Sequence, residues 1–185
     1  MEVNELAQWV VLVFMGVFLL GLTRQLGAFM RPHSEELADM GPALGTEVPS
    51  ALVDDPTRRR LSALIRGKSS WHRAAALVID EQCSGCRSIL DDLVSGIRPP
   101  DVVLVAILKD STSEIFRSTV ASVADVVIAD PHSTGCGAAG IYGTPMVMLL
   151  DERLRVVQKD FGGDLLTRVS EWISEMETEA EQLSA

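Results

Sequence analysis

Two cysteines separated by two residues are the first feature of this chain that could do chemistry. Cys83 and Cys86 lie in the stretch "EQCSGCRSIL", after an apolar run and before a helical pattern. A cysteine thiolate attacks disulfides, and a second thiol one helical turn away can resolve the resulting mixed disulfide. At the junction of a strand and a helix, this C-x-x-C spacing is typical of a redox pair.

The position of the pair favours a thiolate at its first cysteine. If the helix begins here, Cys83 lies among unpaired backbone N–H groups and at the positive end of the helix dipole. Arg87 adds a nearby positive charge, and the residues between the cysteines, Ser84 and Gly85, are small enough for a tight turn. We therefore expect Cys83 to attack and Cys86 to resolve.

A second motif follows about 60 residues later, in "GIYGTPMVMLL". Thr144 and Pro145 open an apolar strand, and proline is tolerated at the first residue of a strand. A bond before proline can be cis, which leaves the preceding backbone free to pair with a bound peptide. Thr144 and Pro145 are therefore predicted to form the edge at which a substrate protein docks.

The elements that must position these residues alternate between strand and helix. This alternation implies parallel strands with crossover helices, and a final strand–turn–strand implies an antiparallel hairpin. The sequence predicts an α/β fold, a mixed sheet with helices on both faces. The expected strands are 73–80, 101–110, 124–130, 146–151 and 154–163, with a short one at 51–53, and the expected helices are 57–67, 83–96, 112–123 and 164–185.

The N-terminal part of the chain predicts a membrane anchor. Residues 6–22 are apolar on every face, and their length of roughly 25 Å as a helix is adequate for a hydrocarbon core. No positive n-region precedes them and no cleavage site follows, so we expect an uncleaved transmembrane helix. The predicted organisation is an anchor at 1–24, a linker at 25–50 and a folded domain at 51–185.

Composition excludes two classes of protein. The net charge is −10 and no basic stripe with interleaved aromatic residues is present, so a nucleic-acid partner is not expected. The chain has three cysteines, an odd number, and is therefore not a small disulfide scaffold.

Taken together, the motifs resemble a thioredoxin-like fold. C-x-x-C at the head of a helix, G-x-x-G-T-P before a hairpin, and a terminal helix carry the resemblance over about residues 51–180. The anchor with "TRQLG" and "GPALGTEVP" is similar to the membrane-anchored methylamine-utilisation (MauD) and TlpA-like thiol–disulfide oxidoreductases. The resemblance implies thiol–disulfide exchange through a redox-active Cys83–Cys86 disulfide, with no further cofactor and with cysteine-containing client proteins and a possible integral-membrane redox partner.

Two positions depart from the pattern of this family. Thioredoxins usually carry a tryptophan just before the first cysteine, where this chain has Gln82. They also carry a buried carboxylate six residues before that cysteine, where this chain has Leu77. The missing proton acceptor argues against general thioredoxin-like reduction and favours a specialised partner.

The sequence gives two conflicting signals about which side of the membrane holds the domain. Arg24 and Arg31 follow the apolar segment, and the positive-inside rule then favours a domain on the cytoplasmic face. The family resemblance implies a domain outside the cytoplasm, and an oxidising compartment suits a disulfide-handling pair. We expect the extracytoplasmic placement, with the cytoplasmic face as the alternative.

Two further functions are alternatives to thiol–disulfide exchange, and the first involves the third cysteine. Cys136 and His132, together with Cys83 and Cys86, make a possible Cys₃His set for zinc or a soft site for copper(I). A redox role secondary to the main pair, or simple packing in a Gly-rich loop, are the other interpretations of Cys136. The second open function is that of a structural subunit in a membrane complex.

Overall fold

The computed structural model describes residues 13–16, 18–19, 21, 40–68, 73–99, 101–109, 112–162 and 164–184. Its contacts divide the chain into two units, residues 1–39 and 40–185. Within the described ranges no helix is both long and apolar enough to cross a membrane. The predicted anchor segment, 6–22, lies largely outside those ranges.

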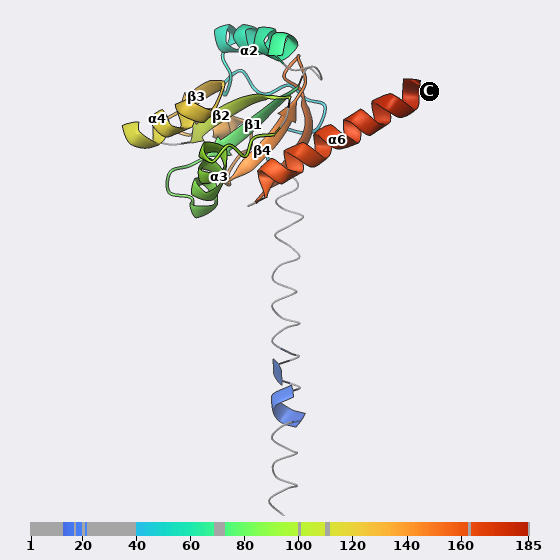
Figure 1. Ribbon diagram of the computed structural model, residues 1–185. Coiled ribbons are helices and arrows are strands. Elements are labelled where there is room, and N and C mark those ends of the chain that lie inside the picture. The colour runs from blue at the N-terminus through green and yellow to red at the C-terminus, as the bar shows by residue number, and fades with distance from the viewer. Residues whose placement is uncertain are drawn as a thin grey trace, which may run out of the picture. The chain divides into compact units, whose positions relative to one another are not determined.

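The second unit is built on one five-stranded sheet (Figure 1). The strand order is β3-β2-β1-β4-β5, so the first strand in the chain is the central one. β1 runs parallel to β2, and β2 runs parallel to β3, whereas β4 is antiparallel to both β1 and β5. The strands are β1 Ala74–Ile79, β2 Val103–Lys109, β3 Val126–Asp130, β4 Met146–Leu150 and β5 Val156–Phe161.

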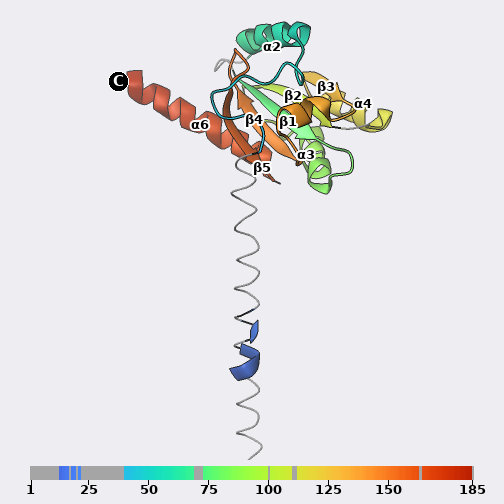
Figure 2. The same cartoon turned by 180° about the vertical axis from the view of Figure 1, so that it is seen from behind.

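Helices cover both faces of this sheet (Figure 2). The side chains of β1 alternate between two hydrophobic clusters, because successive residues of a strand point to opposite faces. One cluster includes apolar residues of α2 and α5, and the other includes those of α3, α4 and α6. The helices are α2 Asp55–Lys68, α3 Ser84–Val94, α4 Glu114–Val123, α5 Thr134–Ala138 and α6 Leu165–Ser184.

This arrangement is the mixed α/β sheet flanked by helices that the sequence predicts, and it is consistent with a thioredoxin-like fold. All six residues of β1 and all five of β4 are buried, which explains why both read as continuous apolar runs. β1 ends at Ile79, four residues before Cys83. The cysteine pair thus follows the central strand at its carboxyl end, which is where open α/β sheets place their ligands.

The start of the folded unit differs from the prediction. Residues 51–53 form a turn rather than a strand, and Leu52 and Val53 bury their side chains in the cluster on the α2 face. α2 begins at Asp55, two residues before Thr57, where the sequence predicts the helix to start. The backbone N–H of Thr57 instead donates to the carboxylate of Asp54 at 2.9 Å, so Asp54 satisfies that group.

Residues 40–50, which the sequence assigned to a linker, belong to the folded unit. The backbone N–H of Gly41 donates to the carbonyl oxygen of Gly140 at 2.9 Å, and that of Val48 donates to Leu154 at the same distance. Val48 is buried, and Glu47 pairs with Arg155 in an isolated β-bridge. The predicted domain boundary at residue 51 is therefore about ten residues too late. Proline and glycine marked turns here, and turns can be packed as tightly as strands.

Candidate functional site

Cys83 and Cys86 lie at the first turn of α3. Cys83 is the N-cap residue, with an extended backbone, and its Sγ accepts the backbone N–H of Cys86 at 3.3 Å. The sulfur therefore takes the place that a Ser, Thr, Asp or Asn oxygen usually takes at a helix start. Both cysteines are free thiols in the structure. Cys83 is partly exposed, whereas Cys86 is fully buried.

The loop before β4 meets this helix start. The Thr144–Pro145 peptide bond is cis, and the carbonyl oxygen of Thr144 lies 3.5 Å from the Sγ of Cys83. A Cβ added to Gly85 would lie 3.4 Å from the Cδ of Pro145 and 3.9 Å from the Sγ of Cys83. Four site residues predicted from the sequence are thus gathered in one place. A methyl group at Gly85 would meet the proline ring at an ordinary contact distance.

The two thiols have opposite electrostatic environments. Partial burial acts to raise the pKa of Cys83, but hydrogen bonds from the thiol and the backbone N–H of Cys86 outweigh it, and the pKa is lowered. Burial, together with the hydrogen bond to Cys83, raises the pKa of Cys86 to about 12. The backbone N–H of Asp80 donates to the Sγ of Cys86 at 3.5 Å. The exposed sulfur is therefore the one that ionises first.

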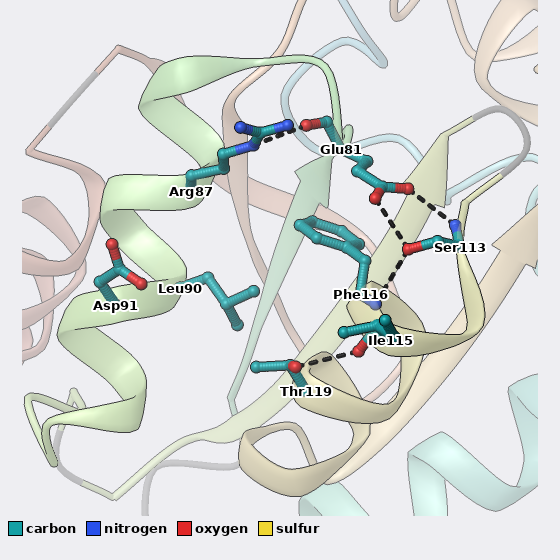
Figure 3. Close-up of a pocket in the computed structure, with 8 residues that line it drawn as sticks. All are labelled: Glu81, Arg87, Leu90, Asp91, Ser113, Ile115, Phe116 and Thr119. Carbon is teal, nitrogen blue, oxygen red and sulfur yellow. Dashed lines mark hydrogen bonds between the residues drawn. The ribbon is translucent and has the colours of Figure 1, made fainter.

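A contact that the sequence did not reveal holds the loop between β1 and α3. The carboxylate of Glu81 accepts both the backbone N–H and the hydroxyl of Ser113, each at 2.7 Å (Figure 3). The Nε of Arg87 donates to the backbone carbonyl of Glu81 at 2.9 Å. Because 32 residues separate Glu81 from Ser113, no local pattern could have paired them. The sequence signals were a carboxylate in the loop after β1 and a serine at the start of α4, the helix that follows β2.

The positions that depart from the thioredoxin pattern are both placed by the structure. Leu77 is fully buried in the cluster that also contains Cys86, and it lies between Ala106 and Val147 of the neighbouring strands. An apolar side chain therefore occupies the place where thioredoxins bury a carboxylate. Gln82 is exposed, and its backbone N–H donates to the carboxylate of Asp80 at 2.8 Å.

The structure does not assemble the alternative metal site. Cys136 is fully buried in the cluster on the α2 face, whereas Cys86 is buried in the cluster on the α3 face. Among the described residues, which include His132 and all three cysteines, no three His, Cys, Asp or Glu side chains are close enough to hold a metal ion. The spacing H-x-x-x-C suggested a common site, but the sheet separates its members. The structure therefore does not bring the four side chains of the Cys₃His set together.

Cys136 is instead held by the end of β3. The carboxylate of Asp130 accepts the backbone N–H of Cys136 at 2.7 Å and that of Gly135 at 3.2 Å. Partial burial acts to raise the pKa of Asp130, but these hydrogen bonds outweigh it and lower the pKa. The thiol of Cys136 has no exposed surface. Packing in the glycine-rich loop describes this residue best.

Comparison with known proteins finds partial similarity to solved structures, each reported one with a TM-score below 0.5, and no similar sequence. No family model matches the chain, and no curated protein matches it. The thioredoxin domain of a thiol-disulfide oxidoreductase from Bacteroides vulgatus has a TM-score of 0.49 at 14% identity, covering 72% of this chain and 97% of that one. StoA from Bacillus subtilis has a TM-score of 0.44 at 14% identity, covering 56% and 83%. A thiol:disulfide interchange protein described as DsbE, from Chlorobium tepidum, has 0.40 at 19% identity, covering 53% and 72%.

Proposed function

We propose that this chain exchanges disulfides with client proteins through Cys83 and Cys86. One observation carries the proposal: the partly exposed Sγ of Cys83 accepts the backbone N–H of Cys86 in the first turn of α3, at 3.3 Å, while the Cys86 side chain lies buried. That hydrogen bond stabilises a thiolate where a client can reach it. The mixed α/β fold with Pro145 beside the pair supports the same function.

The exchange balances in two steps. In the first, the Cys83 thiolate attacks one sulfur of a client disulfide, a Cys83–client disulfide forms, and the other client sulfur leaves as a thiolate. In the second, the sulfur of Cys86 attacks the Sγ of Cys83, the Cys83–Cys86 disulfide forms, and the remaining client sulfur leaves. Two electrons pass from the pair to the client, and the departing thiolate takes up the proton of Cys86. The reverse sequence oxidises a client dithiol.

The second step is assisted by the first. Burial is the largest cause of the raised pKa of Cys86, and the hydrogen bond between the two sulfurs and the negative charge on Cys83 add to it. When Cys83 enters a mixed disulfide it loses its charge, so the contributions from Cys83 are removed, whereas burial and the hydrogen bond from the backbone N–H of Asp80, which lowers the pKa, remain. The pKa of Cys86 therefore falls when its thiolate is needed. This order lets the pair work although Leu77 occupies the place of the usual carboxylate.

The proposal includes the setting of the chain. Residues 6–22 attach it to a membrane as an uncleaved helix, the folded unit faces the extracytoplasmic side, and an integral-membrane protein renews the redox state of the pair. The uncharged segment 6–22 supports attachment, and the redox pair supports an oxidising compartment. In this setting the chain acts like the MauD and TlpA-like proteins, with no cofactor other than its own disulfide.

A trapping experiment tests the function. In the full-length Cys86→Ser variant the mixed disulfide cannot be resolved. Cells expressing this variant should therefore accumulate adducts between Cys83 and client proteins, and dithiothreitol should cleave them by reduction. Cys136→Ser is the matched control, because it removes a thiol that lies outside the site, and it should trap nothing. The double variant Cys83→Ser, Cys86→Ser should also trap nothing. If the single variant Cys86→Ser also formed no adducts, the proposal would be contradicted.

A further inference from the structure

A cavity lies between α3 and α4, and two of its lining residues, Glu81 and Arg87, flank the cysteine pair in the sequence (Figure 3). Its volume is about 370 Å³. It is lined from the α3 side by Arg87, Leu90 and Asp91, and from the α4 side by Ile115 and Phe116. Glu81, two residues before Cys83 in the sequence, also lines it.

The cavity has an apolar base and a charged rim. Leu90 and Phe116 are 7% and 8% exposed and face each other between the two helices (Figure 3). Ile115 is 82% exposed and offers an apolar ledge at the opening. The rim carries two carboxylates, Glu81 and Asp91, and one guanidinium. A long side chain with an aliphatic stem and a charged end has the matching character.

The partners already present on the rim decide the sign of that charge. The Nε of Arg87 donates to the backbone carbonyl of Glu81, and the oxygens of Glu81 accept from Ser113. The two Nη groups of Arg87 make no hydrogen bond or ion pair among the described residues, so one cation and two carboxylates share the rim. The carboxylate of Asp91 is exposed and makes no ion pair or hydrogen bond within the described part of the chain. The rim therefore has an unused anionic acceptor and a net negative charge, which favours a cation.

We propose that this cavity binds a lysine or arginine side chain of the client, close in sequence to its reacting cysteine; this inference rests on the proposed thiol–disulfide exchange. The stem packs against Leu90 and Phe116, and the cationic end pairs with Asp91. The chain as a whole carries a charge of −10, which attracts basic partners over a longer range.

The geometry sets how far the basic residue lies from the client cysteine. Seven residues of helix separate Cys83 from Leu90, which is about 10 Å at 1.5 Å per residue. An extended client segment covers that distance in about three residues, at about 3.3 Å per residue. The basic residue is therefore expected three positions from the client cysteine, on one side of it.

The test uses the reduced full-length chain in detergent and symmetric peptide disulfides. A symmetric disulfide joins two copies of the same peptide, so attack on either sulfur gives the same adduct. Each peptide has a neutral backbone sequence and one variable residue, either lysine, norleucine or glutamate, placed three residues before or three residues after its cysteine. The rate at which the Cys83–Cys86 pair is oxidised is measured by mass spectrometry of acid-quenched samples. Bis(2-hydroxyethyl) disulfide, which is too short to reach the cavity, measures the exchange itself.

The expected result is a preference for lysine in one of the two peptide sets. The lysine peptide should react about threefold faster than the norleucine peptide, because an exposed ion pair contributes a free energy of about that size. The glutamate peptide should react more slowly than the norleucine peptide. Asp91→Asn should abolish the preference and Asp91→Lys should reverse it towards glutamate. Asp92→Asn, which removes the same charge from the next position of α3 outside the cavity, should leave it intact.

Other outcomes separate this inference from the function beneath it. Equal rates for all peptides, or a preference for norleucine or glutamate, would overturn the cavity assignment. In that case, reaction with the short disulfide would still support the proposed exchange. A lysine preference that persists in Asp91→Asn would also overturn the assignment. No reaction with the short disulfide or any peptide would overturn the proposed function, and the inference with it.

Discussion

Two strand–helix junctions of this chain each place a cysteine near a helix start, and they treat it in opposite ways. After β1, the Sγ of Cys83 itself accepts a backbone N–H of α3 and stays partly exposed. After β3, the carboxylate of Asp130 accepts the N–H groups of Gly135 and Cys136, and the Cys136 side chain is fully buried. The difference lies in which atom receives the free N–H groups of the helix.

The comparison shows that a helix start does not by itself activate a cysteine. At α5 a carboxylate already carries the negative charge that the N–H groups stabilise, so a thiolate beside it would be repelled. At α3 no carboxylate intervenes, and the sulfur takes that position. The first junction is therefore suited to chemistry and the second to structure.

The largest expected difference between the junctions is in reactivity towards an alkylating agent. In the native reduced chain, iodoacetamide should label Cys83 at least about 100-fold faster than Cys136, because a buried thiol reacts only after local opening. Labelling followed by peptide mass spectrometry measures both rates in one sample. The ratio should approach one in denaturant. Equal native rates would mean that Cys136 is as accessible as Cys83.

Paired glycine substitutions test the packing of the two junctions. A Cβ at Gly135 would lie 2.6 Å from the backbone oxygen of Ala51, so Gly135→Ala should lower the free energy of unfolding by about 2 kcal/mol. A Cβ at Gly85 meets Pro145 at 3.4 Å, an ordinary contact, so Gly85→Ala should stay within about 1 kcal/mol of the wild type. Urea unfolding of the reduced chain measures both. The opposite order would show that the site is the more tightly packed junction.

Removing the carboxylate at β3 should weaken only the second junction. Asp130→Asn keeps one of the two acceptor oxygens, so it should lower the free energy of unfolding by about 1 kcal/mol, as the loss of one hydrogen bond does, and should speed the labelling of Cys136 but not of Cys83. Because the pKa of Asp130 is lowered by folding, its contribution is present above about pH 4 and is lost as the pH falls through the lowered pKa. Wild type and variant should therefore converge in acid. Glu114→Gln, at an exposed carboxylate of α4, is the control.

The smallest effect concerns the ionisation of Cys83. Its alkylation rate should rise with pH to a plateau whose midpoint lies below the ordinary thiol value of 9.0, because hydrogen bonds from the thiol and the backbone N–H of Cys86 outweigh partial burial and lower the pKa. Cys86→Ser keeps that backbone N–H, so the midpoint in this variant should also stay below 9.0. In denaturant the midpoint should return to the ordinary range. A native midpoint above 9.0 would mean that burial outweighs the hydrogen bonds.

Local patterns in the sequence predicted most of the sheet and the cysteine pair. Continuous apolar runs predicted β1 and β4, and C-x-x-C before a helical pattern predicted the start of α3. These signals are local: strand periodicity, helix periodicity and a cysteine spacing all act within one or two turns of chain. The two departures, Gln82 and Leu77, could likewise be recognised from position alone.

Only the tertiary structure decided the relations between distant segments. The sheet separates Cys136 from Cys86, so a spacing that suggested a metal site joins residues on opposite faces. The Glu81–Ser113 contact and the cavity beside it depend on α3 and α4 packing on the same face. Residues 40–50 contain turn formers and looked like a linker, yet Val48 is buried against the sheet. Composition records what a residue prefers locally, whereas burial and partners depend on which segments meet, and the meeting is set by the topology of the whole sheet.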